Sequence, residues 1–194
     1  QGVRTVAVQK VYSIGDVKST GNQLDLAIEG NGFFQVQLPN GERAYTRSGN
    51  LRMNSVGEVV DSEGNKLEPS ITVPTNATSV TIGTDGTVSV TVSGQTASQE
   101  IGKMELVRFV NPAGLQSMGR SYYAETTASG PPVAGQPGAS GSGLGTIAQG
   151  MLEGSNVRVV EEMVELITGQ RAFEMNSKVV STADRILQST VNMK

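Results

Sequence analysis

The chain has 194 residues, a length that suits one or two compact domains. Its 15 basic and 18 acidic residues give a net charge of −3, so it lacks the excess of Lys and Arg that attracts nucleic acids, and no nucleic-acid partner is expected. His, Cys and Trp do not occur, which excludes disulfides, thiol nucleophiles, His-based triads and the usual zinc sites.

The start of the chain resembles neither a membrane anchor nor a secretory signal. No apolar run approaches the roughly 20 residues that span a bilayer, so direct membrane insertion is not expected. No basic segment followed by an apolar one precedes the first domain. Val3–Val8 has the composition of a strand interior, and we therefore expect that an upstream segment is missing from this sequence.

Residues 1–128 have the pattern of a β-rich domain. Short alternating apolar runs are separated by turn residues, such as 39–41 and 61–65, which is typical of antiparallel strands joined by tight turns. Residues 129–155 follow as a Gly/Pro/Ser-rich loop and linker. Twelve of the seventeen residues from 129 to 145 are Gly, Pro or Ser, and we expect this stretch to be a flexible loop that tolerates shortening.

Residues 156–194 have the pattern of one long amphipathic helix. Ser155 or Asn156 can serve as its N-cap, and only Gly169 interrupts the apolar repeat, whose members recur at steps of three and four. The fold class is therefore α+β, a mainly antiparallel β domain followed by a long C-terminal helix. We expect the apolar face of this helix to form an assembly interface through Val160, Val164, Ile167, Met175, Val179, Ile186 and Leu187.

The length of this helix indicates that it packs in an oligomer. At 1.5 Å per residue it spans roughly 55 Å. A compact domain of about 120 residues has a radius of gyration of roughly 13–14 Å, so the helix overhangs it. Its apolar face then needs another helix, from another copy or from the missing upstream segment. The alternative is a helix that folds back on the β-sheet of its own chain and frays at its end.

Few residues suggest chemistry. Asp61, Glu63 and Asn65 resemble part of a calcium-binding loop, but the glycine is misplaced and the closing Glu is absent, so we expect a solvated turn. Carboxylate pairs such as Asp25 with Glu29, or Glu58 with Asp61, could in principle hydrolyse glycosides, but few aromatic residues accompany them. We therefore expect no catalytic, cofactor-binding or metal site and no enzymatic activity.

Two groups of motifs resemble the bacterial flagellar rod and hook proteins, the axial proteins of the flagellum. Residues 21–34 and 45–51 resemble the β-domain motif that these proteins share. Residues 150–157, 170–178 and 182–187 resemble their C-terminal helix. The resemblance covers nearly the whole chain, and the Gly/Pro-rich stretch is its least specific part. It is greatest to the subunits of the distal rod, with proximal rod and hook subunits as the alternatives.

The resemblance implies a structural function. Copies would polymerise into a helical tube that transmits torque to the hook, next to other rod and hook proteins and inside bushing rings. The subunit would be exported by the flagellar type III system and would lie in the basal body between periplasm and outer membrane. Members of the family begin with a helix that pairs with the C-terminal one, and we expect that this helix is the segment missing from the sequence. Phe173 and Asn176 lie in the helix motif and are expected to contact a neighbour.

Two functions of other classes stay open at this point. A wall-degrading glycosidase would fit a protein that must cross peptidoglycan, although the chain has no His and no nucleophile motif. A β-type adhesin would account for the strands, but it would leave the amphipathic helix without a partner.

Overall fold

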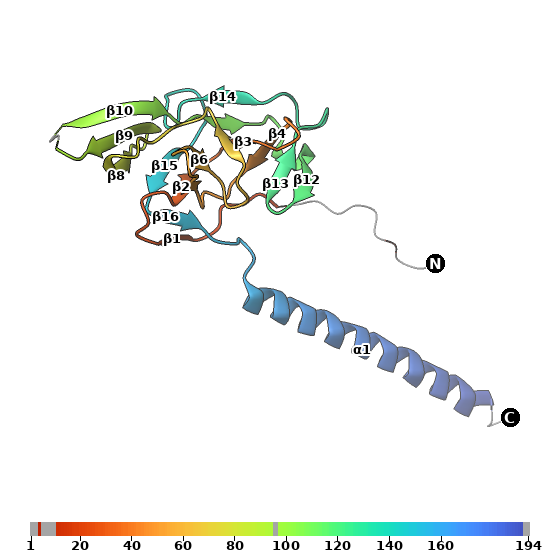
Figure 1. Cartoon of the computed structure of the whole chain (residues 1–194). Helices are drawn as coiled ribbons and strands as arrows, with labels where there is room; N and C mark the ends of the chain where they lie inside the picture. The colour runs from red at the N-terminus through yellow and green to blue at the C-terminus, as the bar shows by residue number, and fades with distance from the viewer. Residues whose placement is uncertain (1–3, 5–10, 95–96, 192–194) are drawn as a thin grey trace. The chain divides into compact units, whose positions relative to one another are not determined.

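The computed structural model describes residue 4, residues 11–94 and residues 97–191, with the side chains of the final helix described up to Gln188 (Figure 1). The chain divides into two units, Gln1–Gly154 and Ser155–Lys194. The first consists of β-strands and the second contains one long helix, which confirms the α+β class. Apart from Arg4, the strand expected over Val3–Val8 lies outside the described residues.

The described part of the first unit contains many short strands and one 3-10 turn, η1. Their bounds are β1 Val17–Ser19, β2 Leu26–Glu29, β3 Phe34–Gln37, β4 Arg43–Thr46, β5 Arg52–Met53, β6 Val59–Val60, β7 Lys66–Glu68, β8 Ala77–Ile82, β9 Thr87–Val92, β10 Ser98–Lys103, β11 Leu106–Arg108, η1 Pro112–Gly114, β12 Gln116–Gly119, β13 Tyr122–Ala124, β14 Val133–Gly135, β15 Thr146–Gln149 and β16 Met151–Glu153.

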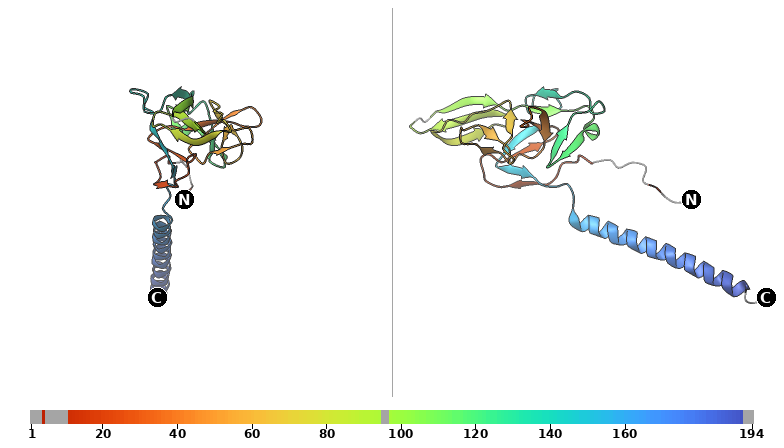
Figure 2. Two further views of the ribbon diagram at one scale, coloured as in Figure 1. Left: turned by 60° about the vertical axis from the view of Figure 1, so that its left-hand side comes forward. Right: turned by 45° about the vertical axis from the view of Figure 1, so that its right-hand side comes forward.

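The strand pairs recorded among these elements are all antiparallel, as the alternating pattern predicts. The largest sheet has the order β12-β13-β4-β3-β7-β6-β5, and a second sheet has the order β10-β9-β8. Three further pairs are β1-β16, β11-β14 and β15-β2. The β8–β10 sheet extends from one side of this unit in Figure 1 and in the right-hand view of Figure 2.

The β3–β4 hairpin shows how the sequence encodes this unit. Phe34 and Val36 are buried while Gln37 is exposed, which is the period-two alternation of a half-buried strand. The turn closes where the Leu38 N–H donates to the Glu42 carbonyl. Gly41 has φ +83°, a conformation that few other residues adopt cheaply.

The core of the β unit has two clusters. The larger is aliphatic and is built around side chains such as Leu26, Ile28 and Leu106, all fully buried. The smaller is aromatic, and within it the Tyr45 and Phe109 rings meet edge to face with centroids 4.8 Å apart. Most aromatic residues of the β unit are thus in this cluster, whereas Phe34 and Tyr122 belong to the larger one.

The loop and linker expected over 129–155 differ from the structure. β14 pairs with β11, β15 with β2 and β16 with β1, and the Ile147 side chain of β15 is almost fully buried. The physical reason is visible at Gly145, where an added Cβ would collide with the Glu29 carbonyl oxygen. Gly30 approaches from the same side, since a Cβ there would lie 2.9 Å from the Gly145 Cα. At Gly30 and Gly145, the lack of a side chain allows two backbone segments to pack closely, and it does not make them disordered.

The second unit contains helix α1, Val159–Val191. It begins three residues after the expected start, beyond a turn in which the Val157 N–H donates to Ser155 Oγ at 3.1 Å. Glu161 and Glu162 lie in its first turn, where the helix dipole favours acidic groups. The expected helix residues 192–194 lie outside the described residues. Over the part of the chain that is described, no helix is long and apolar enough to cross a membrane.

Candidate assembly interface

The apolar side chains of α1 are exposed. Among the residues expected at the assembly interface, the exposed fraction runs from 49% for Ile167 to 76% for Phe173. Asn176 is exposed as well. Burying a Val, Leu or Ile side chain contributes roughly 1.5–3 kcal/mol, so a row of them stabilises any helix contact that covers it.

These side chains lie on two faces of α1 and not on one continuous stripe. A regular helix turns roughly 100° per residue, which separates the apolar residues of the first half from those of the second by close to half a turn. The first face consists of Val159, Val160, Met163, Val164, Leu166 and Ile167. The second face consists of Phe173, Met175, Val179, Val180, Ala183, Ile186 and Leu187.

The predicted interface residues therefore divide between the faces. Val160, Val164 and Ile167 share the first face. The remaining six, which include Asn176, lie on the second, so the continuous apolar repeat that the sequence suggested changes sides between residues 168 and 172. That these residues form contacts between subunits stays a prediction.

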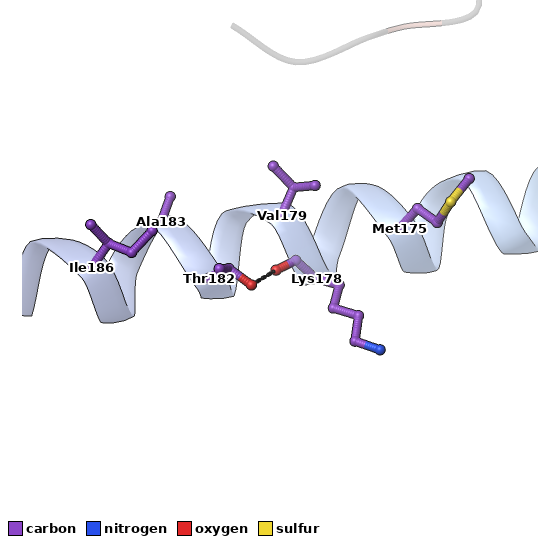
Figure 3. A pocket seen from close by; sticks show the side chains of 6 residues that line it. All are labelled: Met175, Lys178, Val179, Thr182, Ala183 and Ile186. Atoms are coloured by element: carbon purple, nitrogen blue, oxygen red, sulfur yellow. Dashed lines mark hydrogen bonds between the residues drawn. The ribbon is translucent and has the colours of Figure 1, made fainter.

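The second face contains an open groove of about 540 Å³. In Figure 3 the side chains of Met175, Val179, Ala183 and Ile186 point to one side of the helix and Lys178 points to the other. The Thr182 hydroxyl donates to the Lys178 carbonyl at 2.8 Å and so satisfies its own donor within the helix. The groove is shallow and open, and most of the side chains that line it are apolar.

A second feature, which the sequence pattern does not indicate, lies in the β unit. It consists of the Arg47 guanidinium and the acceptors around it, and we call it the Arg47 clasp. Arg47 donates to Glu153 Oε2 from Nε at 2.9 Å and from Nη2 at 2.7 Å. Its other N–H groups donate to the carbonyls of Ile28, Gly30 and Gly32 at 3.0–3.2 Å. Every N–H of the guanidinium is thereby used, which only the forked arginine geometry allows.

The clasp fixes the end of β16, which is the last strand before α1. Glu153 also accepts the Gly15 N–H on Oε1 at 3.1 Å, so one carboxylate holds the approach to β1 as well as β16. The two side chains are only 19% and 10% exposed, which protects the pair from solvent screening. Both residues lie in the motifs 45–51 and 150–157, but pattern alone does not show that they meet.

The turn at Asp61 is buried and structural, which corrects the expected solvated turn. Asp61 is 5% exposed, and its Oδ1 accepts the N–H groups of Glu63 and Asn65, both at 2.9 Å. Its Oδ2 accepts the Tyr122 hydroxyl at 2.6 Å and the Asn65 amide. Burial, followed by this hydrogen bond to Asp61, raises the pKa of the Tyr122 hydroxyl. The carboxylate is occupied, and the described residues contain no acidic cluster with the spacing of a metal site.

Glu58 is a half-buried carboxylate with two hydrogen-bond donors beside it. Hydrogen bonds from Lys66 Nζ at 2.9 Å and Asn54 Nδ2 at 2.9 Å hold its pKa below the usual range. The general acid of a glycosidase needs a raised pKa, so Glu58 does not have the shift of that acid.

Two family models match the chain. Residues 27–90 match the flagellar hook protein FlgE/F/G D1 domain, and residues 148–193 match the flagellar basal body rod FlgEFG protein C-terminal domain. The first match covers the strands from β2 to β9, and the second covers the end of β15, β16 and α1.

Curated relatives match over nearly the whole chain. The flagellar basal-body rod protein FlgG of Buchnera aphidicola subsp. Schizaphis graminum is 48% identical over 187 residues, which cover 96% of this chain and 71% of the relative. The FlgG of Caulobacter vibrioides is 43% identical over all of this chain and 73% of its own length. The chain therefore belongs to the FlgE/F/G family of flagellar hook and rod proteins.

Within the family the similarity is to FlgG, which confirms the resemblance to the distal rod subunits. Caulobacter vibrioides offers a comparison inside one organism, because its FlgF is 34% identical over 97% of this chain whereas its FlgG is 43% identical. The proximal rod alternative is thus less similar over the same residues.

Proposed function

We propose that this chain is a structural subunit of the distal rod of the flagellar basal body, where copies polymerise into a helical tube. The observation that carries the proposal is the long helix α1, whose apolar side chains are exposed along both halves and fall within the matched rod C-terminal domain. A helix of 33 residues, about 50 Å long, with this much exposed apolar surface is stabilised when neighbouring helices cover it.

Torque transmission has a physical basis in the two units. Helices packed along the rod resist extension, because stretching them would break both the hydrogen bonds within each helix and the side-chain contacts between helices. The β units, arranged outside the helices, hold neighbouring copies against twisting. The Arg47 clasp stiffens the β unit where its last strand leads towards α1.

The pairing of β1 with β16 brings together the chain that enters the β unit and the chain that leaves it. Val17 lies opposite Glu153 in antiparallel register, so the chain before β1 and the chain after β16 leave the ladder at the same end.

Partners and location follow from the same proposal. The subunit contacts other copies of itself, the adjacent rod and hook proteins and the bushing rings around the rod. It reaches this place through the flagellar type III export system and lies between the periplasm and the outer membrane. Its role is mechanical, without catalysis.

The test is deletion of the gene for the intact protein, followed by purification of basal bodies from the same cells. We expect basal bodies that end before the distal rod, without a hook, and full restoration when the gene is returned. Complete hook–basal bodies in the deletion strain would contradict the proposal. Mass spectrometry of wild-type basal bodies provides the positive control, since the chain must be among their components.

A further inference from the structure

The two apolar faces of α1 place a strict condition on its neighbours. Because the faces point in opposite directions, one partner helix cannot cover both while α1 stays straight. A two-fold symmetric pair brings the same face of each copy together, and it leaves the other face of both in water. Parallel copies side by side without a shift form a less stable contact, because the apolar side chains in the first half of one copy would meet the charged side of the next.

A shift along the helix axis removes this conflict. Val159, Met163 and Ile167 form a row at steps of four on the first face. Sixteen residues further on, Met175, Val179 and Ala183 form an equal row that lines the groove of the second face. Sixteen residues correspond to roughly 24 Å of helix and leave the two rows roughly 160° apart, almost back to back. A parallel copy displaced by this amount seats the first row of one helix against the groove of the next.

The charged side chains of α1 also favour displaced neighbours. Opposite the first apolar face lie acidic side chains, and opposite the second lie mainly basic ones. The acidic set is Glu161, Glu162 and Glu165, with Arg158 paired to Glu161 at 3.0 Å. The basic set is Arg171, Lys178 and Arg185, accompanied by Glu174. A parallel neighbour displaced in the opposite sense brings the acidic side chains of one copy against the basic side chains of the other. A neighbour in register brings neither the apolar faces nor the charged sides together in matching pairs.

We propose that the occupant of the α1 groove is a second copy of α1, parallel and displaced by about sixteen residues, so that Met163 of one copy lies against Val179 of the next. This rests on the proposed function and specifies its contact. The interface is heterologous, because two different faces meet, and such a contact repeats without closing into a pair. An open-ended array of helices is thus encoded within α1 itself.

Disulfide crosslinking tests this contact directly, because these 194 residues contain no Cys. The intact protein carries the double substitution Met163→Cys and Val179→Cys, with any cysteine outside this chain replaced by Ser, and is expressed in its own cells. Basal bodies are purified, oxidised with copper–phenanthroline and separated on a non-reducing gel. We expect a ladder of dimers, trimers and higher multimers that collapses to monomer on reduction, because each copy then has a bond partner on both sides.

Three controls keep the result interpretable. The variants Met163→Cys and Val179→Cys should each remain monomeric. In the proposed contact the first face of one copy meets the second face of the next, so a single cysteine has no thiol opposite it. The pair Met163→Cys and Ser181→Cys places the second thiol away from the groove and should give no ladder. Retained motility of each variant shows that the rod assembles.

Each other outcome overturns the inference. Dimers from a single variant would show that like faces meet. A monomeric double variant in motile cells would show that something else covers the groove, such as the upstream segment of the longer protein, while the proposed function stands. Absence of the unsubstituted protein from basal bodies would remove the proposed function together with this contact.

Discussion

At the scale of single residues, Arg47 illustrates a role that only the folded chain defines. Its five N–H donors meet carbonyls of the β2–β3 region and the Glu153 carboxylate, which are distant in sequence. Removing one partner of a buried ion pair costs several kcal/mol, because the other charge is left without compensation. The Arg43–Glu68 pair offers a contrast, since the Arg43 side chain is 62% exposed.

Arg47→Lys should lower the free energy of unfolding by about 2 kcal/mol or more, because an ammonium cannot reproduce the fork of contacts. Urea unfolding followed by tyrosine fluorescence measures this. The matched control Arg43→Lys should change stability by less than about 0.5 kcal/mol, as exposed pairs contribute little. Equal effects of the two substitutions would contradict the clasp.

The buried tyrosines predict a loss of stability in alkali. Burial raises the pKa of Tyr45 to about 12, and the pKa of Tyr122 is raised too, whereas an unfolded tyrosine titrates near 10. Their contribution is complete below about pH 10 and is lost as the pH rises through the folded values, because the unfolded chain releases these protons first. Between about pH 10 and 12, unfolding free energy should fall by about 1.4 kcal/mol per pH unit for each tyrosine.

The measurement is urea unfolding across this pH range for the wild type, Tyr45→Phe and Tyr122→Phe. Each substitution should reduce the fall in unfolding free energy with pH by about 1.4 kcal/mol per pH unit, the contribution of one proton, regardless of its effect at neutral pH. Slopes that match the wild type would show that neither hydroxyl keeps its proton in the folded state.

At the scale of elements, most strands and the helix follow from local pattern, and the departures have physical causes. The β3–β4 hairpin was predictable because alternation and turn residues act within ten positions. β14 to β16 were not, because a Gly-rich composition indicates flexibility equally well as close packing against another backbone. The Asp61 turn was misjudged for a similar reason, since its partner Tyr122 is far away in sequence.

Gly145→Ala should destabilise the β unit by about 1–3 kcal/mol, because its Cβ would collide with the Glu29 carbonyl oxygen. The control Gly102→Ala, whose Cβ would lie 3.6 Å from Ile71 Cγ1 in ordinary contact, should cost less than about 1 kcal/mol. Thermal or urea unfolding compares the two. A neutral Gly145→Ala would support the expectation of a freely tolerant stretch over 129–145.

On α1, Ile167→Asp and Leu187→Asp each place a charge on a different apolar face and should each abolish rod assembly in the intact protein. Burying an unpaired carboxylate against a neighbour is costly, whereas the same charge in water on the free chain is not. The β unit should therefore unfold at the same urea concentration as the wild type. The control Ser181→Lys adds a charge to the basic side of α1, which in the proposed contact faces acidic side chains, and this variant should assemble. Basal bodies with normal rods from either face variant would refute the interface.

At the scale of the whole molecule, the chain combines a folded β unit with a helix whose apolar side chains are exposed. The need for a partner was predictable from helix length alone, because an amphipathic helix longer than its domain must find apolar surface elsewhere. The change of face was present in the sequence too, but it appears only when the angular position of each residue is followed through Gly169 and not when spacings alone are compared.

The most direct test of the central claim is cryo-electron microscopy of basal bodies purified from the cells that make the intact protein. The account predicts a helical tube whose inner wall contains α1 from many copies, with neighbouring helices parallel and displaced by about sixteen residues. Density in which the protein is a free monomer, with α1 folded onto its own β unit, would contradict it.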